Sequence, residues 1–72
     1  MKKIDCLGDF CPIPVIKAKD AFKKLSPNES FMIITDHSCV VESLSAQFSK
    51  FNCIIETDEV INGVWEITVT RL

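Results

Sequence analysis

Five side chains of this sequence are suited to covalent or metal chemistry: Cys6, Cys11, Cys39, Cys53 and His37. A thioredoxin-type dithiol has its second cysteine three positions after the first, and Pro14 occupies that position after Cys11. A closed zinc site needs ligands paired two to four residues apart, and no pair of cysteines here makes a convincing match. A Ser/His/Asp signature and a glycine-rich phosphate loop are also lacking. We therefore expect single-thiol chemistry, with no metal and no cofactor.

Cys11 has the strongest case for reactivity. It opens the segment Cys11-Pro12-Ile13-Pro14, and apolar residues recur at helical spacing from Pro12 onward. Pro is favoured in the first turn of a helix, which places Cys11 at or next to the N-cap. The partial positive charge there stabilises a thiolate and lowers the pKa of the thiol. The alternative interpretation is that Cys11 is only a small residue that fills the start of the helix. Pro12 and Pro14 are expected to fix the loop that presents the thiol.

The other three cysteines have structural interpretations that compete with chemical ones. Unpaired cysteine is among the most buried residue types, so Cys6 and Cys53 are predicted to be core residues. Cys39 follows Asp36 and His37 in a predicted loop, and the sequence leaves open whether it packs or acts beside the reactive thiol. His37 is either a solvent-exposed helix cap or a hydrogen-bond donor near the reactive sulfur.

The hydrophobic spacing predicts two amphipathic helices. The first begins near Pro12, runs for about four turns and stops at residues 26–28. The second is capped by side chains of residues 36–38 and ends at Asn52, which tolerates the left-handed conformation. Their expected core-facing residues are Val15, Ala18, Phe22 and Leu25 in the first helix and Val41, Leu44, Phe48 and Phe51 in the second.

The first two predicted strands decide where the chemistry lies. Residues 3–7 form a short strand, and residues 31–35, apolar on both sides, are typical of a central strand covered on both faces or nearly so. A helix that connects them makes the two strands parallel, so both end at the same edge of the sheet. We expect the loop that carries Cys11 and the loop of residues 36–39 to meet there, beside two helix N-termini.

A hairpin closes the chain, with Asn62-Gly63 between strands at residues 53–59 and 64–72. A two-residue loop would set acidic side chains against the apolar row of the last strand. A three-residue loop, residues 61–63, instead pairs position 59 with 65, 57 with 67 and 55 with 69. We therefore expect a type I turn with Gly63 in the left-handed position of a G1 bulge.

Length and charge restrict the class of protein. The chain has 72 residues, enough for one small domain over residues 1–72, and a net charge of −2 that disfavours direct nucleic-acid binding. No apolar run reaches the length of a membrane span, and Asp5 and Asp9 interrupt any signal-peptide apolar region after Met1-Lys2-Lys3. We expect a cytoplasmic protein without membrane insertion, in which the cysteines stay reduced.

The segment from Asp5 to Val15, with Gly8 ahead of Cys-Pro-x-Pro, resembles the signature of the TusA/SirA/YedF-like sulfur-carrier family. The resemblance covers residues 1–72 as a single domain. It implies an α/β two-layer sandwich, βαβαββ, with two helices packed on a four-stranded mixed sheet. It also implies a sulfur carrier or sulfurtransferase in which Cys11 accepts sulfane sulfur as a persulfide and passes it from a donor protein to an acceptor. Independent enzymatic turnover is not implied.

Some positions depart from the commonest family pattern. Leu7, Asp9, His37-Ser38 and Asn52-Cys53 stand where other residues are usual, and the Leu-Gly-Asp-x-Cys-Pro-x-Pro form is similar to members associated with YeeE/YedE-type membrane sulfur transporters. A thiosulfate-handling partner of such a transporter is therefore one alternative. A non-catalytic interaction or regulatory module on the same scaffold is another. Donor, acceptor, pathway and oligomeric state are left open.

The distribution of charge indicates a docking surface for an acidic partner. Residues 1–25 carry six Lys against three Asp, whereas residues 26–72 carry two basic against seven acidic side chains. Helical lysines ordinarily form a solvated face. The asymmetry nevertheless predicts that Lys17 and Lys24 orient a partner protein.

Overall fold

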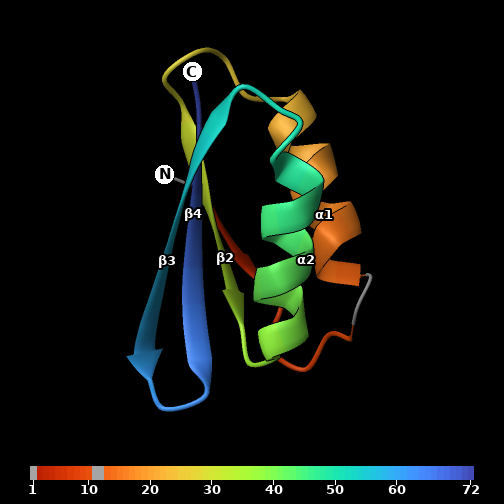
Figure 1. Cartoon of the computed structure of the whole chain (residues 1–72), viewed down its shortest axis with the longest axis vertical. Helices are drawn as coiled ribbons and strands as arrows, with labels where there is room; N and C mark the ends of the chain where they lie inside the picture. The colour runs from red at the N-terminus through yellow and green to blue at the C-terminus, as the bar shows by residue number, and fades with distance from the viewer. Residues whose placement is uncertain (1, 11–12) are drawn as a thin grey trace.

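The structure is a computed structural model that describes residues 2–10 and 13–72. Met1, Cys11 and Pro12 lie outside the described residues, so the predictions for Cys11 and Pro12 themselves are not addressed by the fold. The elements alternate as the sequence predicts, in the order βαβαββ (Figure 1). Their bounds are β1 Lys2–Asp5, α1 Ile13–Lys23, β2 Ser30–Thr35, α2 Ser38–Phe48, β3 Cys53–Ile61 and β4 Val64–Arg71.

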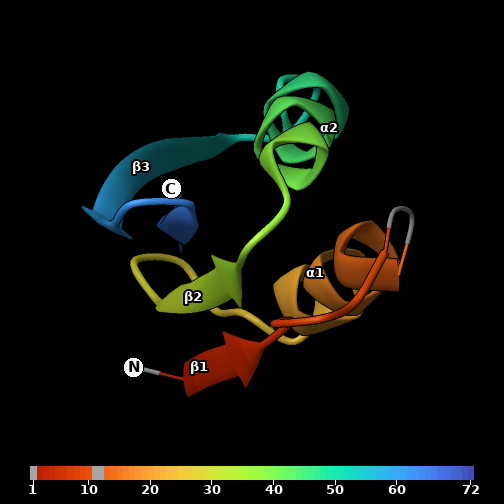
Figure 2. The ribbon, with the colours of Figure 1, turned by 90° about the horizontal axis from the view of Figure 1, so that it is seen from below.

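The four strands form one mixed sheet in the order β1-β2-β4-β3. β1 and β2 are parallel, while β4 runs antiparallel to both β2 and β3. Both helices lie against the same face of this sheet, which Figures 1 and 2 show from two directions. The predicted two-layer sandwich is therefore confirmed. Within the described part of the chain, neither helix has the length and apolar character needed to cross a membrane.

The core lies between the sheet and the two helices. Its largest members are completely buried, and each such aliphatic or aromatic side chain stabilises the fold by about 1.5 to 3 kcal/mol relative to its exposed state. The buried apolar residues are Cys6, Val15, Ala18, Ala21, Phe31, Ile33, Val40, Leu44, Phe48, Ile67 and Val69.

β2 is a central strand, but only one of its faces is fully covered. Phe31, Ile33 and Thr35 point toward the helices and are buried, whereas Met32 and Ile34 on the other face are only half-buried. The expectation of coverage on both faces is therefore wrong. The helices pack on a single side, so the alternate residues of β2 remain on the open face of the sheet.

Both helices are shorter than predicted. α1 ends at Lys23, so its 11 residues make about three turns, and Leu25 packs on the core from the segment that follows. In α2 the buried stripe runs through Val40, Leu44 and Phe48, with Val41 only partly buried. The prediction of Val41 in the stripe is wrong by one position, because residues four apart lie on the same helix face and Val40 keeps that spacing.

The predicted caps differ from those observed. His37 is the N-cap of α2, with an extended backbone and no capping hydrogen bond from its side chain. At the other end the helix stops at Phe48, and Phe51, expected in the core stripe, is exposed beyond it. Asn52 does not take the left-handed conformation; among the described residues other than glycine, Asn28 does, with φ of 71°. The Asn28 N–H donates to the Arg71 carbonyl at 2.7 Å, which holds that turn against the last strand.

The hairpin has the register that side-chain parity predicts. Ile55 pairs with Val69, Thr57 with Ile67 and Glu59 with Trp65, and a register shift follows Glu59. Pairing continues to Ile61 and Val64, so only Asn62 and Gly63 lie between the strands, and the prediction of a three-residue loop over residues 61–63 is wrong. The predicted register is kept because the irregularity between Glu59 and Ile61 takes up the extra residue within β3. Gly63 has φ of 86°, so its predicted left-handed conformation is confirmed, whereas Asn62 has no positive φ.

Replacing Gly63 with Val is expected to destabilise the protein by about 1 to 2 kcal/mol, because a β-branched residue is strained at positive φ. A Cβ at this position would have no atom within 4 Å, so the cost comes from the backbone conformation and not from a clash. Urea unfolding measures it. Gly63→Asn is the matched control and should cost clearly less, since Asn tolerates this region. Equal stability of the Val variant and the wild type would contradict the turn assignment.

Candidate functional site

The geometry around the motif is defined by the residues on either side of Cys11 and Pro12. The Ile13 N–H, at the start of α1, donates to the Phe10 carbonyl at 2.9 Å. Pro14, in the first turn of α1, is almost completely buried. Its ring therefore anchors the start of the helix in the core, and its role in fixing the motif loop stays a prediction.

The loop after β1 is tied to the sheet and to the loop after β2. The Cys6 N–H donates to the Ile34 carbonyl at 2.8 Å, which extends the parallel pairing of the strands by one residue. The Gly8 N–H donates to Asp36 Oδ1 at 3.1 Å. Gly8 has φ of 82°, a conformation that side chains rarely adopt. Gly8 and Asp36, two residues singled out in the sequence, therefore contact each other directly.

Aromatic contact joins the same two loops. The rings of Phe10 and His37 lie edge to face with their centroids 5.1 Å apart. Together with the bond between Gly8 and Asp36, this contact confirms that the segment leading to the motif and the segment after β2 share one end of the sheet, as parallel strands require. Phe10 was not singled out from the sequence, and its 69% exposure is the signal that distinguishes it from a core aromatic residue.

Asp36 and His37 form an electrostatic pair. The hydrogen bond from the Gly8 N–H lowers the pKa of the Asp36 carboxyl below its ordinary value, and the neighbouring His37 lowers it further. His37 Nδ1 is buried without a well-oriented hydrogen bond, and its nearest acceptor, Asp36 Oδ1, lies 2.8 Å away. A protonated imidazole would therefore form an ion pair with the carboxylate. The predicted role of His37 as a solvent-exposed cap is wrong, because its side chain is only partly exposed and makes no capping bond, whereas a role near the reactive sulfur stays a prediction.

The cysteines of the described chain occupy different environments. Cys6 is completely buried, and burial raises the pKa of its thiol, with Asp9 and Asp5 adding to the effect. Cys53 is partly buried, its thiol lies 3.5 Å from the Phe48 carbonyl, and burial raises its pKa as well. The prediction of a core position is confirmed for Cys6, whereas Cys53 lies at the border of the core. Cys39, the second residue of α2, is exposed.

An ion pair braces the loop against α1. Lys17 Nζ lies 2.6 Å from Asp9 Oδ2, and this carboxylate raises the pKa of the Lys17 ammonium group. The sequence pointed to Lys17 as a partner-binding residue and did not predict the contact, because nothing in the spacing of residues 9 and 17 indicates that the loop folds back over the helix. Lys24, the other predicted docking residue, follows the opposite end of α1.

Apolar side chains surround the motif on the surface. Leu7 is 49% exposed and Ile13 is 45% exposed, in addition to Phe10, and Ile16 on the next turn of α1 is exposed as well. In the described residues, no group of three or more His, Cys, Asp or Glu side chains is arranged to hold a metal ion. The site thus combines a thiol motif at a helix start, two polar residues from the neighbouring loop and an apolar rim.

These features define a small α/β protein built around a single thiol motif. The chain matches the family Sulfurtransferase TusA over residues 2–71 and belongs to that family.

Individual relatives agree with this assignment. The chain is 39% identical over 52 residues to a candidate sulfur carrier protein of Methanocaldococcus jannaschii, an alignment that covers 72% of this chain and 68% of the relative. It is 27% identical over 70 residues to a candidate sulfur carrier protein of Archaeoglobus fulgidus, covering 96% and 91% of the two chains. The crystal structure of a SirA-like protein from Desulfitobacterium hafniense superposes with a TM-score of 0.89 at 34% identity, covering 97% of this chain and 96% of that one.

The bond between Asp36 and Gly8 predicts a pH-dependent contribution to stability. Because folding lowers the pKa of Asp36, the contribution is fully present above the unfolded pKa of about 3.9 and is lost as the pH falls through the folded value. Asp36→Asn should lower stability at pH 7, and the difference from the wild type should be smaller at pH 3, as measured by urea unfolding. Asp20→Asn, at an exposed position of α1, is the control and should show no such dependence. An equal loss at both pH values would contradict the charge-based account.

Proposed function

We propose that this chain is a sulfur carrier that accepts sulfane sulfur as a persulfide on Cys11 and passes it to a partner protein or acceptor thiol. Membership of the TusA family supports the carrier role. The observation that carries the assignment to Cys11 is the Cys-Pro-x-Pro motif itself, whose cysteine comes two residues before the start of α1. Two of the alternative thiols are less suited, since burial raises the pKa of both Cys6 and Cys53, whereas Cys39 is exposed and keeps the open role beside the reactive thiol.

The transfer is balanced without an external oxidant or reductant. The Cys11 thiolate attacks the outer sulfur of a donor persulfide, forming a new S–S bond while the donor S–S bond breaks and the donor leaves as a thiolate. With thiosulfate as the donor, sulfite is the leaving group. An acceptor thiolate then attacks the outer sulfur of the Cys11 persulfide and releases the Cys11 thiolate.

Two features of the described residues support anion handling at this end of the molecule. N–H groups in the first turn of α1 would stabilise a thiolate or persulfide anion on a residue just before the helix. His37, when protonated, adds a positive charge on the neighbouring loop and offsets the Asp36 carboxylate. The exposed Leu7, Phe10 and Ile13 give a donor or acceptor protein apolar surface to cover during transfer.

We place this relay in the cytoplasm, where thiols remain reduced, with donor and acceptor proteins as its partners. The Leu7-Gly8-Asp9 form of the loop keeps a membrane sulfur transporter of the YeeE/YedE type as an alternative partner, with thiosulfate as the sulfur source. The apolar rim around the motif also favours a second candidate function, that of a non-catalytic interaction module, because such a rim would serve binding without sulfur chemistry.

Intact-mass analysis after incubation with a sulfane-sulfur donor separates these functions. The wild type should gain the mass of one sulfur atom, and a reducing agent should remove it. Cys11→Ser should abolish the adduct, whereas Cys6→Ser should retain it because that thiol is buried. Absence of an adduct at any cysteine would favour the interaction module, and an adduct retained in Cys11→Ser would refute the assignment of the site.

His37→Ala is expected to slow the loading of Cys11 modestly without abolishing it, because the substitution removes a hydrogen-bond donor beside the motif loop but leaves the helix N-terminus in place. The rate of adduct formation is the informative quantity, and Cys11→Ser is the control that should give no adduct. Identical rates for the wild type and His37→Ala would show that His37 is only a surface residue of the loop.

A further inference from the structure

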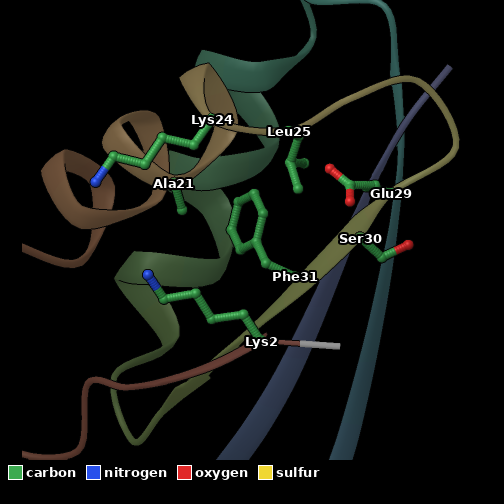
Figure 3. A pocket seen from close by; sticks show the side chains of 7 residues that line it. All are labelled: Lys2, Ala21, Lys24, Leu25, Glu29, Ser30 and Phe31. Atoms are coloured by element: carbon green, nitrogen blue, oxygen red, sulfur yellow. The ribbon is translucent and has the colours of Figure 1, made fainter.

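A groove lies at the end of the molecule opposite the motif loop. It is a hollow of about 520 Å³ bordered by Lys2 of β1, by Ala21, Lys24 and Leu25 at and just after the end of α1, and by Glu29 and Phe31 at the start of β2 (Figure 3). We call this hollow the basic groove. A second hollow of about 270 Å³ adjoins it at Lys2, Ala21 and Lys24 and continues along β1 and α1 to Lys3, Lys17 and Asp20.

The basic groove combines an apolar floor with a charged rim. Ala21 and Leu25 contribute to the floor, and Phe31 lies fully buried beneath it. In Figure 3 the ammonium ends of Lys2 and Lys24 extend to the same side, away from Glu29. A floor of this kind distinguishes the groove from the flat, solvated face that surface lysines ordinarily form.

The lysines on this rim have few acidic neighbours: Glu29 borders the groove and Asp20 borders the adjoining hollow. Within residues 2–10 and 13–72, no acidic side chain lies at ion-pair distance from Lys2, Lys3 or Lys24, whereas Lys17 is paired with Asp9. The charge therefore remains available to a partner even though the chain as a whole carries a net charge of −2. The attraction for an anion is local to the groove and is not a property of the whole surface.

We propose that the basic groove binds a short acidic segment of a partner protein, with carboxylates on Lys2 and Lys24 and an apolar side chain on the floor. β1 is an edge strand that pairs only with β2 in the described sheet, so its outer edge also offers backbone hydrogen-bonding groups to an extended peptide. A bare polyphosphate or a nucleic-acid backbone would leave the apolar floor and the edge of β1 without a partner. Phe31 is buried and offers no surface on which a base could stack.

The position of the basic groove makes it independent of the proposed sulfur chemistry. It lies at the N-terminal ends of β1 and β2, whereas the motif loop follows the C-terminal end of β1, and α1 alone separates the two regions by about 16 Å. A partner held by the groove would leave the motif loop accessible to a second protein. This inference extends beyond the carrier function and does not require it.

Fluorescence anisotropy with a short fluorescein-labelled peptide of glutamate and leucine residues tests the proposal. Lys2→Glu/Lys24→Glu should weaken binding by about tenfold or more, because two favourable charge pairs become repulsive. Lys23→Glu/Lys50→Glu changes the net charge equally at exposed positions outside the groove and should weaken binding by less than about threefold. Replacing the leucines of the peptide with serine should weaken binding without any change to the protein.

Three outcomes would overturn the proposal. The two double variants could weaken binding equally, which would indicate a general electrostatic effect. The serine peptide could bind as well as the leucine peptide, which would remove the role of the apolar floor. Inorganic polyphosphate or vesicles containing anionic lipid could bind in a Lys2- and Lys24-dependent manner while the peptide shows no saturable binding up to about millimolar concentration, which would assign the groove to another class of ligand. Thermal unfolding of each variant verifies that the fold is intact.

Discussion

The parallel pairing of β1 with β2 is the constraint on which the rest of the site depends. Its register is fixed by burial, because a slip of one residue would turn Ile4 and Cys6 from the core to the open face of the sheet. With Cys6 held in the core and its N–H bonded to Ile34, the chain leaves the sheet at a defined point. Gly8 then lies within hydrogen-bond distance of Asp36, so a buried cysteine without an evident chemical role determines where the motif segment begins.

The features that the sequence predicts well are those fixed by a repeating pattern. Parity selects one hairpin register because only that register sets Ile55 opposite Val69, and the βαβ crossover requires the two site loops to lie at one edge. Helix ends are harder to predict from the sequence, because tertiary contacts decide where each helix stops. Asn28 and Asn52 are equally suited to a left-handed turn, but it is Asn28 that takes this conformation, in a turn closed by a bond to Arg71 on another strand.

In the candidate site, too, the sequence predicts the features that a pattern fixes and misses those that tertiary contacts fix. Proline at a helix start and parallel strand ends are visible in the sequence and point to the motif loop and to the segment of residues 36–39. The contacts that brace this loop are not visible, since Asp9 and Lys17 meet only because the loop folds over α1, and Phe10 meets His37 only through the crossing of two loops. The sequence alone does not show that Phe10 and Leu7 are exposed. These residues indicate a binding surface only once the structure gives their burial.

The fold places the lysines of residues 1–25 in different surroundings, so they do not act as one positive surface. Lys17 is paired with Asp9 and so contributes little net attraction near the motif, whereas Lys19 keeps its charge while it donates to the neutral Gln47 amide. Lys2 and Lys24, which form no ion pair within the described residues, border the basic groove at the other end of α1. An anionic sulfur donor approaching the motif would therefore depend on the N-terminus of α1 and on His37, and not on the lysines of the helix as a group. The excess of lysines in residues 1–25 therefore favours the binding of an anionic partner at the basic groove, away from the thiol motif.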